Sequence, residues 1–205
     1  MSTVCVDDAD LVTRARQGDP AAFGELVDRH RVSVYRAALA ALGSHAEAED
    51  AAQDTFLLAY RRLDTFRGDA SFKTWLLTIA WHQAINRRRS LMRMWRRMVE
   101  PTQGEEAEAI VSIAGSGPTP EEVVAGAQLR QAIGAAIRRL SPTLRDALLL
   151  AQSGDHSYEE IGAMMRAPVG TIKWRVSEAR RRVRESLQKS GFGTRTENRE
   201  PRTAT

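Results

Sequence analysis

The chain has 205 residues, 42% of them hydrophobic, and this size suits one or two small domains rather than one large core. No series of alternating Val, Ile and Thr runs is bounded by hairpin turns, so the pattern excludes an all-β fold and favours an all-α one. Cys5 is the only cysteine, which excludes an internal disulfide and a cysteine-based zinc cluster.

The net charge is only +4, but the charges are segregated along the chain. Residues 86–98 form an arginine run without an acid, and residues 166–189 hold eight basic residues against two acidic ones. Between them, residues 100–128 contain six glutamates and no basic residue. Two basic bodies around an acidic strap favour contact with polyphosphate at two places, although a basic run can equally be a solvated helix face.

The N-terminus, MSTVCVDDAD, lacks the basic and apolar regions of a signal peptide. No apolar run approaches the roughly eighteen residues that a membrane span needs. We therefore expect a soluble, cytoplasmic protein that has no contact with a membrane.

Four helices are expected in the first half of the chain. Asp19-Pro20 starts the second of them, because proline suits a first helical turn. Ser44, with Glu47 three residues on, has the pattern of a capping box and starts the third. The expected helices cover residues 7–17, 20–43, 44–63 and from 71 into the arginine run, and they make up a first domain of residues 7–98.

A linker and a second helical domain are expected in the other half. Residues 99–120 contain IAGSGPTP and show weak periodicity, which indicates a flexible acidic linker. The second domain covers residues 121–189, and the polar tail 190–205 is predicted to be disordered. The helices of the second domain are expected at residues 121–140, 142–152, 157–165 and 169–189. The predicted fold is therefore all-α, with two small helical domains joined by the linker.

The stretch SYEEIGAMMRAPVGTIKWRVSEARRR, residues 157–182, holds two amphipathic runs around a tight turn. Ser157 and Glu160 have capping-box spacing, and Pro168 breaks the chain. The second run has a basic face opposite one apolar stripe, a pattern typical of a helix-turn-helix whose second helix enters the major groove. An ordinary bundle with a cationic surface is the alternative. The apolar stripe consists of Ile172, Val176, Ala179 and Val183.

Residues 46–89 read AEAEDAAQDTFLLAYRRLDTFRGDASFKTWLLTIAWHQAINRRR and closely resemble region 2 of the extracytoplasmic-function (ECF) sigma factors. These are the small two-domain promoter-specificity subunits of bacterial RNA polymerase. The upstream GDPAAFGELVDRHRVSVYRAAL is similar to that family's first helix pair, and SYEEIGAMMRAPVGTIKWRVSEARRRV to its region 4. The resemblance spans residues 7–189 in the family's order, with a linker in place of the region 3 domain. It implies an alternative sigma factor that binds core polymerase, recognises minus-35 and minus-10 elements and melts promoter DNA.

The resemblance implies that the helix carrying the AED..Q(E/D)TF pattern binds the clamp helices of the polymerase's largest subunit. The implied residues step by three and four along one helix face, where acids can pair with basic groups of a partner around an apolar anchor. A solvated acidic face would be the default interpretation without the family context. The implied core-binding residues are Asp50, Gln53, Asp54, Leu57 and Arg61.

Minus-10 recognition is implied in the loop at residues 66–71 and on the helix after it, where a base is flipped into a protein pocket. Such a pocket needs polar groups, an aromatic or apolar wall and nearby cations. His82 departs from the family, whose members often have Asn there. The implied minus-10 residues are Phe66, Arg67, Gly68, Asp69, Ser71, His82, Asn86, Arg87, Arg88 and Arg89.

Minus-35 recognition is implied on the helix at residues 169–189. Two residues depart from the family here, since glycine is usual at Arg166 and a small polar residue is common at Trp174. The predicted minus-35 residues are Thr171, Lys173, Trp174, Arg175, Ser177 and Arg181.

The expected partners are the RNA polymerase core, through its clamp helices and flap, promoter DNA, and an anti-sigma factor of the kind that commonly holds family members. The linker glutamates, Glu105, Glu106 and Glu108 among them, are hypothesised to mimic nucleic-acid charge in the polymerase cleft.

No enzyme activity, cofactor or metal is predicted, because neither a phosphate-binding glycine loop nor a GxSxG elbow is present and the histidines lack metal-ligand spacing. Two alternatives remain open. A stand-alone helix-turn-helix regulator would leave residues 46–89 unexplained. An interaction protein such as an anti-anti-sigma mimic would not need both basic surfaces. The histidines are His30, His45, His82 and His156.

Overall fold

The structure is a computed structural model that describes residues 6–98 and 120–192. The linker up to residue 119, with its glutamates, the tail from residue 193 and Cys5 lie outside the described residues. Within the described ranges the chain forms helices and no strand, which confirms the predicted all-α class. The helices of the first half are α1 (Asp8–Arg16), α2 (Pro20–Leu42), α3 (His45–Arg61), the short 3-10 helix η1 (Leu63–Thr65) and α4 (Phe72–Met98).

Local capping fixes where the first helices begin and end. The Asp19 carboxylate accepts from the backbone N–H groups of Ala21 and Ala22 at the start of α2. Gly43 ends that helix in the left-handed conformation, at φ 71°, which glycine adopts without a Cβ clash. Only half of the expected capping box forms on α3: the Ser44 hydroxyl accepts from the Glu47 N–H at 3.5 Å. The Glu47 carboxylate pairs with Arg87 instead.

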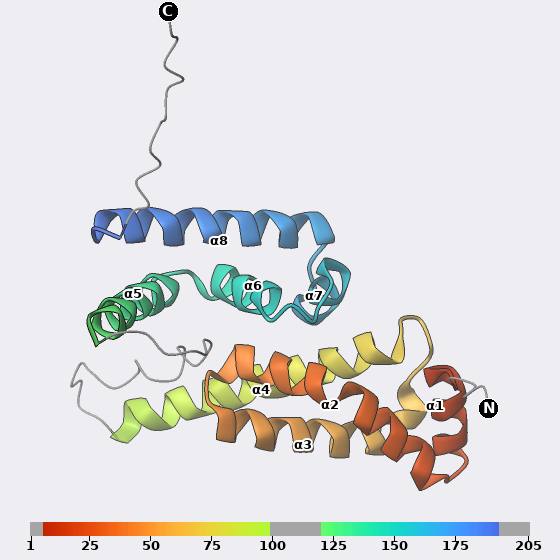
Figure 1. The fold of residues 1–205 in the computed structure, drawn as a ribbon. Coiled ribbons are helices and arrows are strands. Elements are labelled where there is room, and N and C mark those ends of the chain that lie inside the picture. Colours follow the sequence, from red (N-terminus) through yellow and green to blue (C-terminus); the bar gives the residue numbers. More distant parts are fainter. Residues whose placement is uncertain (1–5, 99–119, 193–205) are drawn as a thin grey trace, which may run out of the picture.

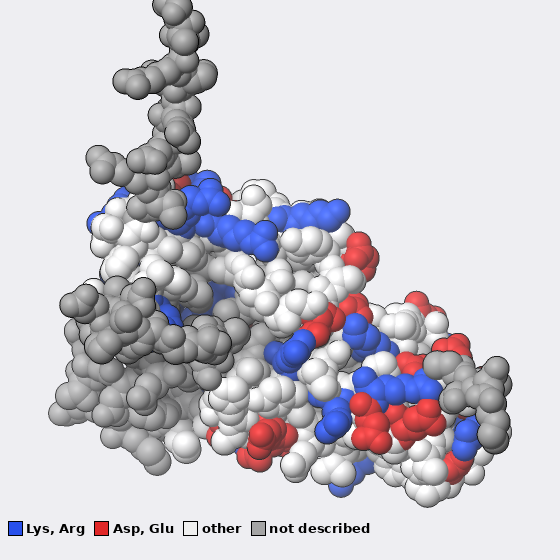
Figure 2. Space-filling model, in the orientation of Figure 1, with Lys and Arg blue, Asp and Glu red and all other residues white. Residues whose placement is uncertain are grey.

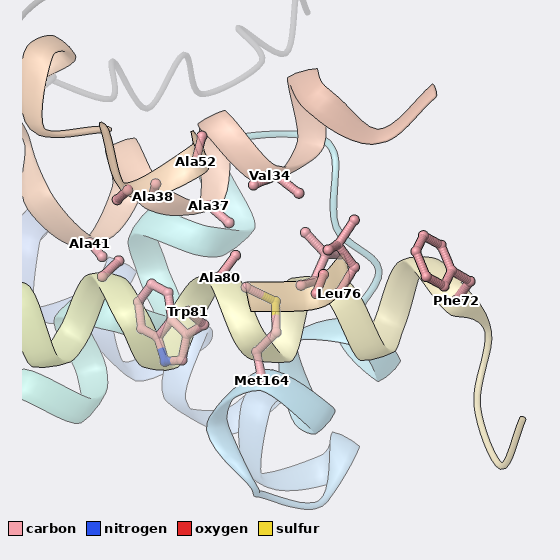
Figure 3. Close-up of a cluster of buried hydrophobic side chains, with 14 of the residues drawn as sticks. Val34, Ala37, Ala38, Ala41, Ala52, Phe72, Leu76, Ala80, Trp81 and Met164 are labelled. Atoms are coloured by element: carbon pink, nitrogen blue, oxygen red, sulfur yellow. The ribbon is translucent and has the colours of Figure 1, made fainter. Parts of the chain in front are cut away.

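The first half packs α2, α3 and α4 against one another through small side chains. Alanine is buried on each of the three helices, so their axes can approach toward the lower end of the roughly 8–10 Å range for helix pairs. Larger side chains close the ends of this core, including Leu76, which is fully buried. Figure 3 shows several of the contacts. The buried alanines include Ala37, Ala38, Ala41, Ala48, Ala51, Ala52, Ala80 and Ala84.

The second half consists of α5 (Pro120–Arg138), α6 (Pro142–Gln152), α7 (Tyr158–Met165) and α8 (Val169–Lys189). The bounds of α6 and α8 are the predicted ones, 142–152 and 169–189. Pro142 is the first residue of α6, and Pro168 directly precedes α8, so a proline marks the start of both helices. Leu140, Leu144 and Leu148 pack with Ala179 of α8 into a small separate core. No described helix combines the length and apolarity that a membrane span requires.

The two halves are docked on each other, which the sequence did not predict. The layer of α5 to α8 lies over α2 and α4 in Figure 1, and α7 contacts α4 while α6 contacts α2. Met164 of α7 is 1% exposed and points toward Ala80 and Trp81 of α4 (Figure 3). The hydrophobic core of the first half therefore continues into the second half.

His156, between α6 and α7, lies at this junction. Both of its ring nitrogens are shielded, and neither has a hydrogen-bond partner among the described residues. Burial lowers the pKa of His156 below 6.5, with Glu160 and Asp155 opposing the shift and Lys73 and Arg36 adding to it. The folded chain therefore holds this imidazole neutral where an unfolded chain would begin to protonate it.

We expect the free energy of unfolding to fall as the pH drops below about 6.5, because the unfolded chain then binds a proton that the folded chain excludes. Thermal unfolding at a series of pH values between 7.5 and 5.5 measures this. His156→Phe keeps a ring but takes up no proton, so its unfolding temperature should change less over that range. His45→Phe, at an exposed position, is the control. The same pH dependence in His156→Phe and the parent chain would contradict the prediction.

Candidate nucleic-acid and polymerase interfaces

The turn between α7 and α8 is built from three backbone features. The predicted capping box at the start of α7 is present: the Ser157 N–H donates to Glu160 at 2.8 Å, and the Glu160 N–H donates to the Ser157 hydroxyl at 3.1 Å. Arg166 ends α7 in the left-handed conformation, at φ 49°, where family members usually have glycine. The Ala167 N–H then donates to the Gly162 carbonyl at 2.9 Å and closes the turn.

Gly162 is a structural requirement of this turn that sequence reasoning missed. A Cβ at this position would lie 2.8 Å from the Ala167 carbonyl oxygen, which is backbone and cannot move aside cheaply. Glycine in the middle of a short helix was the available signal, because it costs roughly 1 kcal/mol relative to alanine and so indicates a packing reason.

The two faces of α8 follow the prediction at most positions, but Val183, predicted in the buried stripe, is only half-buried. Ile172 and Val176 are at most 1% exposed, with Ala179 fully buried beside them. On the other side Lys173, Trp174, Ser177 and Arg181 are exposed, and Thr171 and Arg175 are half-buried. Trp174 is 61% exposed, so it does not pack against a neighbouring helix. Lysine and arginine gather along α8 in Figure 2.

A shallow hollow of about 360 Å³ lies on the exposed side of α8. Its lining adds Tyr158 of α7 and two arginines, Arg180 and Arg184, to the predicted residues Lys173, Ser177 and Arg181. A basic hollow with an aromatic wall beside a groove-sized helix can hold a phosphate or a base edge. The sequence pattern had placed this surface but had not selected these three additional residues.

Some of the basic charge on α8 is neutralised within the helix. Glu178 accepts from Arg181 at 2.8 Å and from Arg182 at 2.7 Å, and Arg181 also pairs with Glu185. These hydrogen bonds lower the pKa of Glu178 to about 2. Of the predicted minus-35 residues, Arg181 is therefore already engaged, whereas Lys173 has no carboxylate partner in the described part of the chain.

The predicted core-binding residues form one exposed surface on α3, which we call the α3 face: Asp50, Gln53, Asp54, Leu57 and Arg61. Leu57 is 59% exposed, although it is apolar. Tyr60 is 50% exposed next to it and stacks edge-on against Phe23, with ring centroids 4.9 Å apart. Tyr60 was not predicted, and it enlarges the apolar part of the surface.

Arg87, which was predicted to contact minus-10 DNA, lies against the acids of α3. Its guanidinium donates to Asp50 at 2.9 Å, to Asp54 at 3.5 Å and also to Glu47. The hydrogen bond that Arg87 donates to Glu47, with smaller contributions from Asp50, raises the pKa of Arg87. The structure thus brings one predicted minus-10 residue together with two predicted core-binding residues.

The predicted minus-10 loop is divided between exposed and packed residues. Arg67, Gly68, Asp69 and Ser71 are exposed. Phe66 is half-buried, and its ring centroid lies 5.4 Å from that of Trp75 and 5.7 Å from that of Phe72. The backbone carbonyl of Phe66 accepts from Arg16 of α1, so this residue also fixes the loop to the domain.

The residues predicted on α4 are divided in the same way. Asn86 and Arg89 are exposed, but Arg88 pairs with Asp146 of α6 at 2.9 Å. His82 is half-buried, and burial together with the charge of Arg166 lowers its pKa. The predicted minus-10 residues therefore do not form one free surface: Asn86 and Arg89 are exposed, whereas Arg87 lies against α3 and Arg88 against α6. Within the described ranges no group of His, Cys, Asp and Glu could hold a metal ion.

Comparison with known proteins decides the family. The model for sigma-70 region 2 matches residues 26–94, and the model for sigma-70 region 4 matches residues 130–183. The ECF RNA polymerase sigma factor SigW of Bacillus subtilis (strain 168) is 31% identical over 177 residues, which are 86% of this chain and 95% of the relative. This chain belongs to the ECF RNA polymerase sigma factors. It is an alternative sigma factor that directs promoter-specific transcription initiation, as its sequence predicted.

Further relatives agree. The ECF RNA polymerase sigma-E factor of Escherichia coli (strain K12) is 35% identical over 188 residues, covering 88% of this sigma factor and 94% of the relative. The sigma factor RpoE of Bartonella quintana, solved in complex with the anti-sigma factor NepR, is 27% identical with a TM-score of 0.57, covering 81% and 96% of the two chains. CnrH, in complex with the cytosolic domain of CnrY, shares the fold with a TM-score of 0.58 at 24% identity, covering 89% and 97%.

We expect Gly162→Ala to lower the free energy of unfolding by about 1–3 kcal/mol, because the added methyl group overlaps a backbone carbonyl. Gly170→Ala is the matched control: a Cβ there meets nothing within 4 Å, so the change should be neutral or stabilising. Thermal or urea unfolding of both variants measures the difference. Equal stability of the two variants would show that the turn does not need glycine.

Proposed function

We propose that this sigma factor binds core RNA polymerase through the α3 face and reads promoter DNA with α4 and α8. The observation that carries the proposal is the pattern of burial on α3. Its opposite side, with Ala51, Thr55 and Ala59, is buried in the domain, whereas the five residues of the α3 face are exposed. An exposed stripe that combines acids with an apolar side chain is suited to a partner with complementary charge, as the resemblance to region 2 implies for the clamp helices.

The α8 surface supports minus-35 recognition. Its buried stripe fixes the helix on α6 and α7, so that Lys173, Trp174 and Ser177 point away from the domain. An α-helix fits the major groove, where lysine and arginine donate to guanine and hydroxyl groups hold the backbone phosphates. The hollow beside these residues gives a DNA backbone a basic surface to lie on.

The loop of residues 66–71 and the exposed side of α4 support minus-10 recognition. Arg67, Asn86 and Arg89 provide exposed cationic and amide groups on this side of the domain. They are suited to the phosphates and base edges of a separated strand. His82 is half-buried and Arg88 pairs with Asp146, so both are partly covered in this structure.

Several assignments complete the proposal. The functional units are the first domain, residues 7–98, and the second, residues 121–189, and the polymerase flap is the further core contact. An anti-sigma factor is an expected partner, and the Bartonella quintana neighbour is itself held by one. As a regulatory initiation factor the chain acts in the cytoplasm and has no enzyme activity of its own. The charge-mimicking role of the linker glutamates is retained as a hypothesis.

Asp54→Arg should impair binding to core polymerase by at least about tenfold. The change places a cation opposite the basic groups that the clamp helices are expected to present, and like charges repel. Asp10→Arg makes the same charge change at an exposed position on α1, away from α3, and it should bind nearly normally. Co-purification with core polymerase and run-off transcription on genomic fragments provide the measurements. A parent chain that fails to bind core would contradict the proposed function and leave a stand-alone DNA-binding regulator.

Lys173→Ala should weaken binding to a minus-35 duplex by about 1–3 kcal/mol if the lysine contacts a base edge. Lys189→Ala, at the far end of α8, is the matched control and should change the affinity only slightly. The duplex is taken from a promoter found by the run-off assay, and fluorescence anisotropy gives both affinities at one salt concentration. Equal losses in the two variants would indicate contact with the phosphates alone.

A further inference from the structure

The docked halves share one ion pair that is nearly enclosed. Arg88 of α4 donates to both carboxylate oxygens of Asp146 of α6, at 2.9 and 3.1 Å. The two side chains are only 17% and 10% exposed. Parallel hydrogen bonds from one guanidinium to one carboxylate are among the strongest ionic contacts in proteins.

The second domain alone does not provide the buried carboxylate of Asp146 with a close cationic partner. Asp146 lies on the buried side of α6 together with Leu144, Ala147 and Leu150, and it is the one buried ionisable residue in the described part of the chain. Within the second half its nearest cation is Arg145, at 3.9 Å. A carboxylate that is buried away from water needs a cation or hydrogen-bond donor close to it. For Asp146 this close cation is Arg88, which belongs to the first half of the chain.

Other contacts at the junction hold the two halves in the same arrangement. Lys73 of α4 pairs with Glu160 of α7 at 2.9 Å and donates to the carbonyl of Asp155 at 3.2 Å. Arg36 of α2 pairs with the carboxylate of Asp155. Together with the burial of Met164 against α4, these contacts make a continuous interface of apolar and charged groups.

We propose that the second domain acts as an internal competitor of promoter DNA for the minus-10 surface, with the carboxylate of Asp146 holding the guanidinium that a DNA phosphate would otherwise bind. The inference rests on the proposed function in assigning Arg88 to DNA. A carboxylate and a phosphate both accept two parallel hydrogen bonds from arginine, so they exclude each other at this guanidinium.

The closed arrangement affects the two partners differently. The α3 face is exposed while the domains are docked, so the clamp helices can reach it before the domains separate. Arg88 becomes available only when α6 moves away from α4. The apparent DNA affinity of the free chain is therefore reduced by the fraction of molecules that are closed.

The decisive variant is Asp146→Asn in the full chain, which keeps the shape of the side chain but removes its charge. Its radius of gyration is measured by small-angle scattering, and its affinity for a fluorescent single-stranded DNA of mixed sequence by anisotropy. We expect a larger radius and DNA binding roughly threefold to tenfold tighter. Asp10→Asn changes the net charge equally at an exposed site on α1, and it should alter neither measurement beyond the small effect of one charge.

A second set of variants tests the interface without touching Asp146. Arg36→Asp and Asp155→Arg should each open the chain, and combining them should restore the compact radius and the weaker DNA binding, because the pair is then re-formed with reversed signs. Circular dichroism confirms that each variant is folded. Restoration by the double variant supports docking of the kind seen here.

Two results would overturn the proposal: an unchanged radius in Asp146→Asn, or an opened chain whose DNA affinity is the same as that of Asp10→Asn. Arg88→Gln, added to Asp146→Asn, shows which idea has failed. If it weakens DNA binding of the opened chain, Arg88 does contact DNA and only the competition is wrong. If it has no effect, the minus-10 assignment of Arg88 is wrong as well. Core binding, measured separately, reports on the sigma function itself.

Discussion

Close contact between α2, α3 and α4 is the constraint on which the rest of the structure depends. Alanine makes many of the contacts, so the three helices lie near each other, and their charged side chains are carried on the outer faces. One outer face is the acidic stripe of α3, and another is the arginine run of α4. A larger residue at Ala51 or Ala80 would push the helices apart and would also disturb the packing of the second domain against α4.

The same close packing couples the two surfaces of the first domain that are proposed to bind core polymerase and DNA. Arg87 reaches from α4 across to Asp50 and Asp54, so its charge is shared with residues assigned to core binding. A cation that a partner brings to these acids has to share them with Arg87 or displace it. Charge on the α3 face and the charge of Arg87 on α4 therefore cannot be altered independently.

Local chemistry made much of the fold predictable from the sequence. The caps at Ser157 and Asp19, and the prolines that start or precede helices, gave bounds that agree with the structure to within one or two residues for most helices. The apolar stripe likewise identified the outer face of α8, whereas the residues of the α3 face came from the resemblance to region 2. The contacts that were missed join distant segments, such as Arg87 with Asp50, 37 residues apart, and Arg88 with Asp146, 58 residues apart. No local pattern encodes such pairs, because they depend on how the helices are placed in three dimensions.

The glutamate pairs on α8 have a consequence for how this helix would distinguish DNA sequences. A cation that is free in solution displaces condensed counterions when it meets a phosphate, and each such contact makes binding steeper in salt, by about 0.9 in the logarithmic slope for duplex DNA. Arg181 and Arg182 are already paired with Glu178 and Glu185, so they bring less of this unspecific attraction than their number suggests. The balance of binding energy shifts toward the base edges that Lys173 and its neighbours can reach. A helix with a lower net charge spends less time on arbitrary sequences, which raises the ratio of specific to unspecific DNA binding.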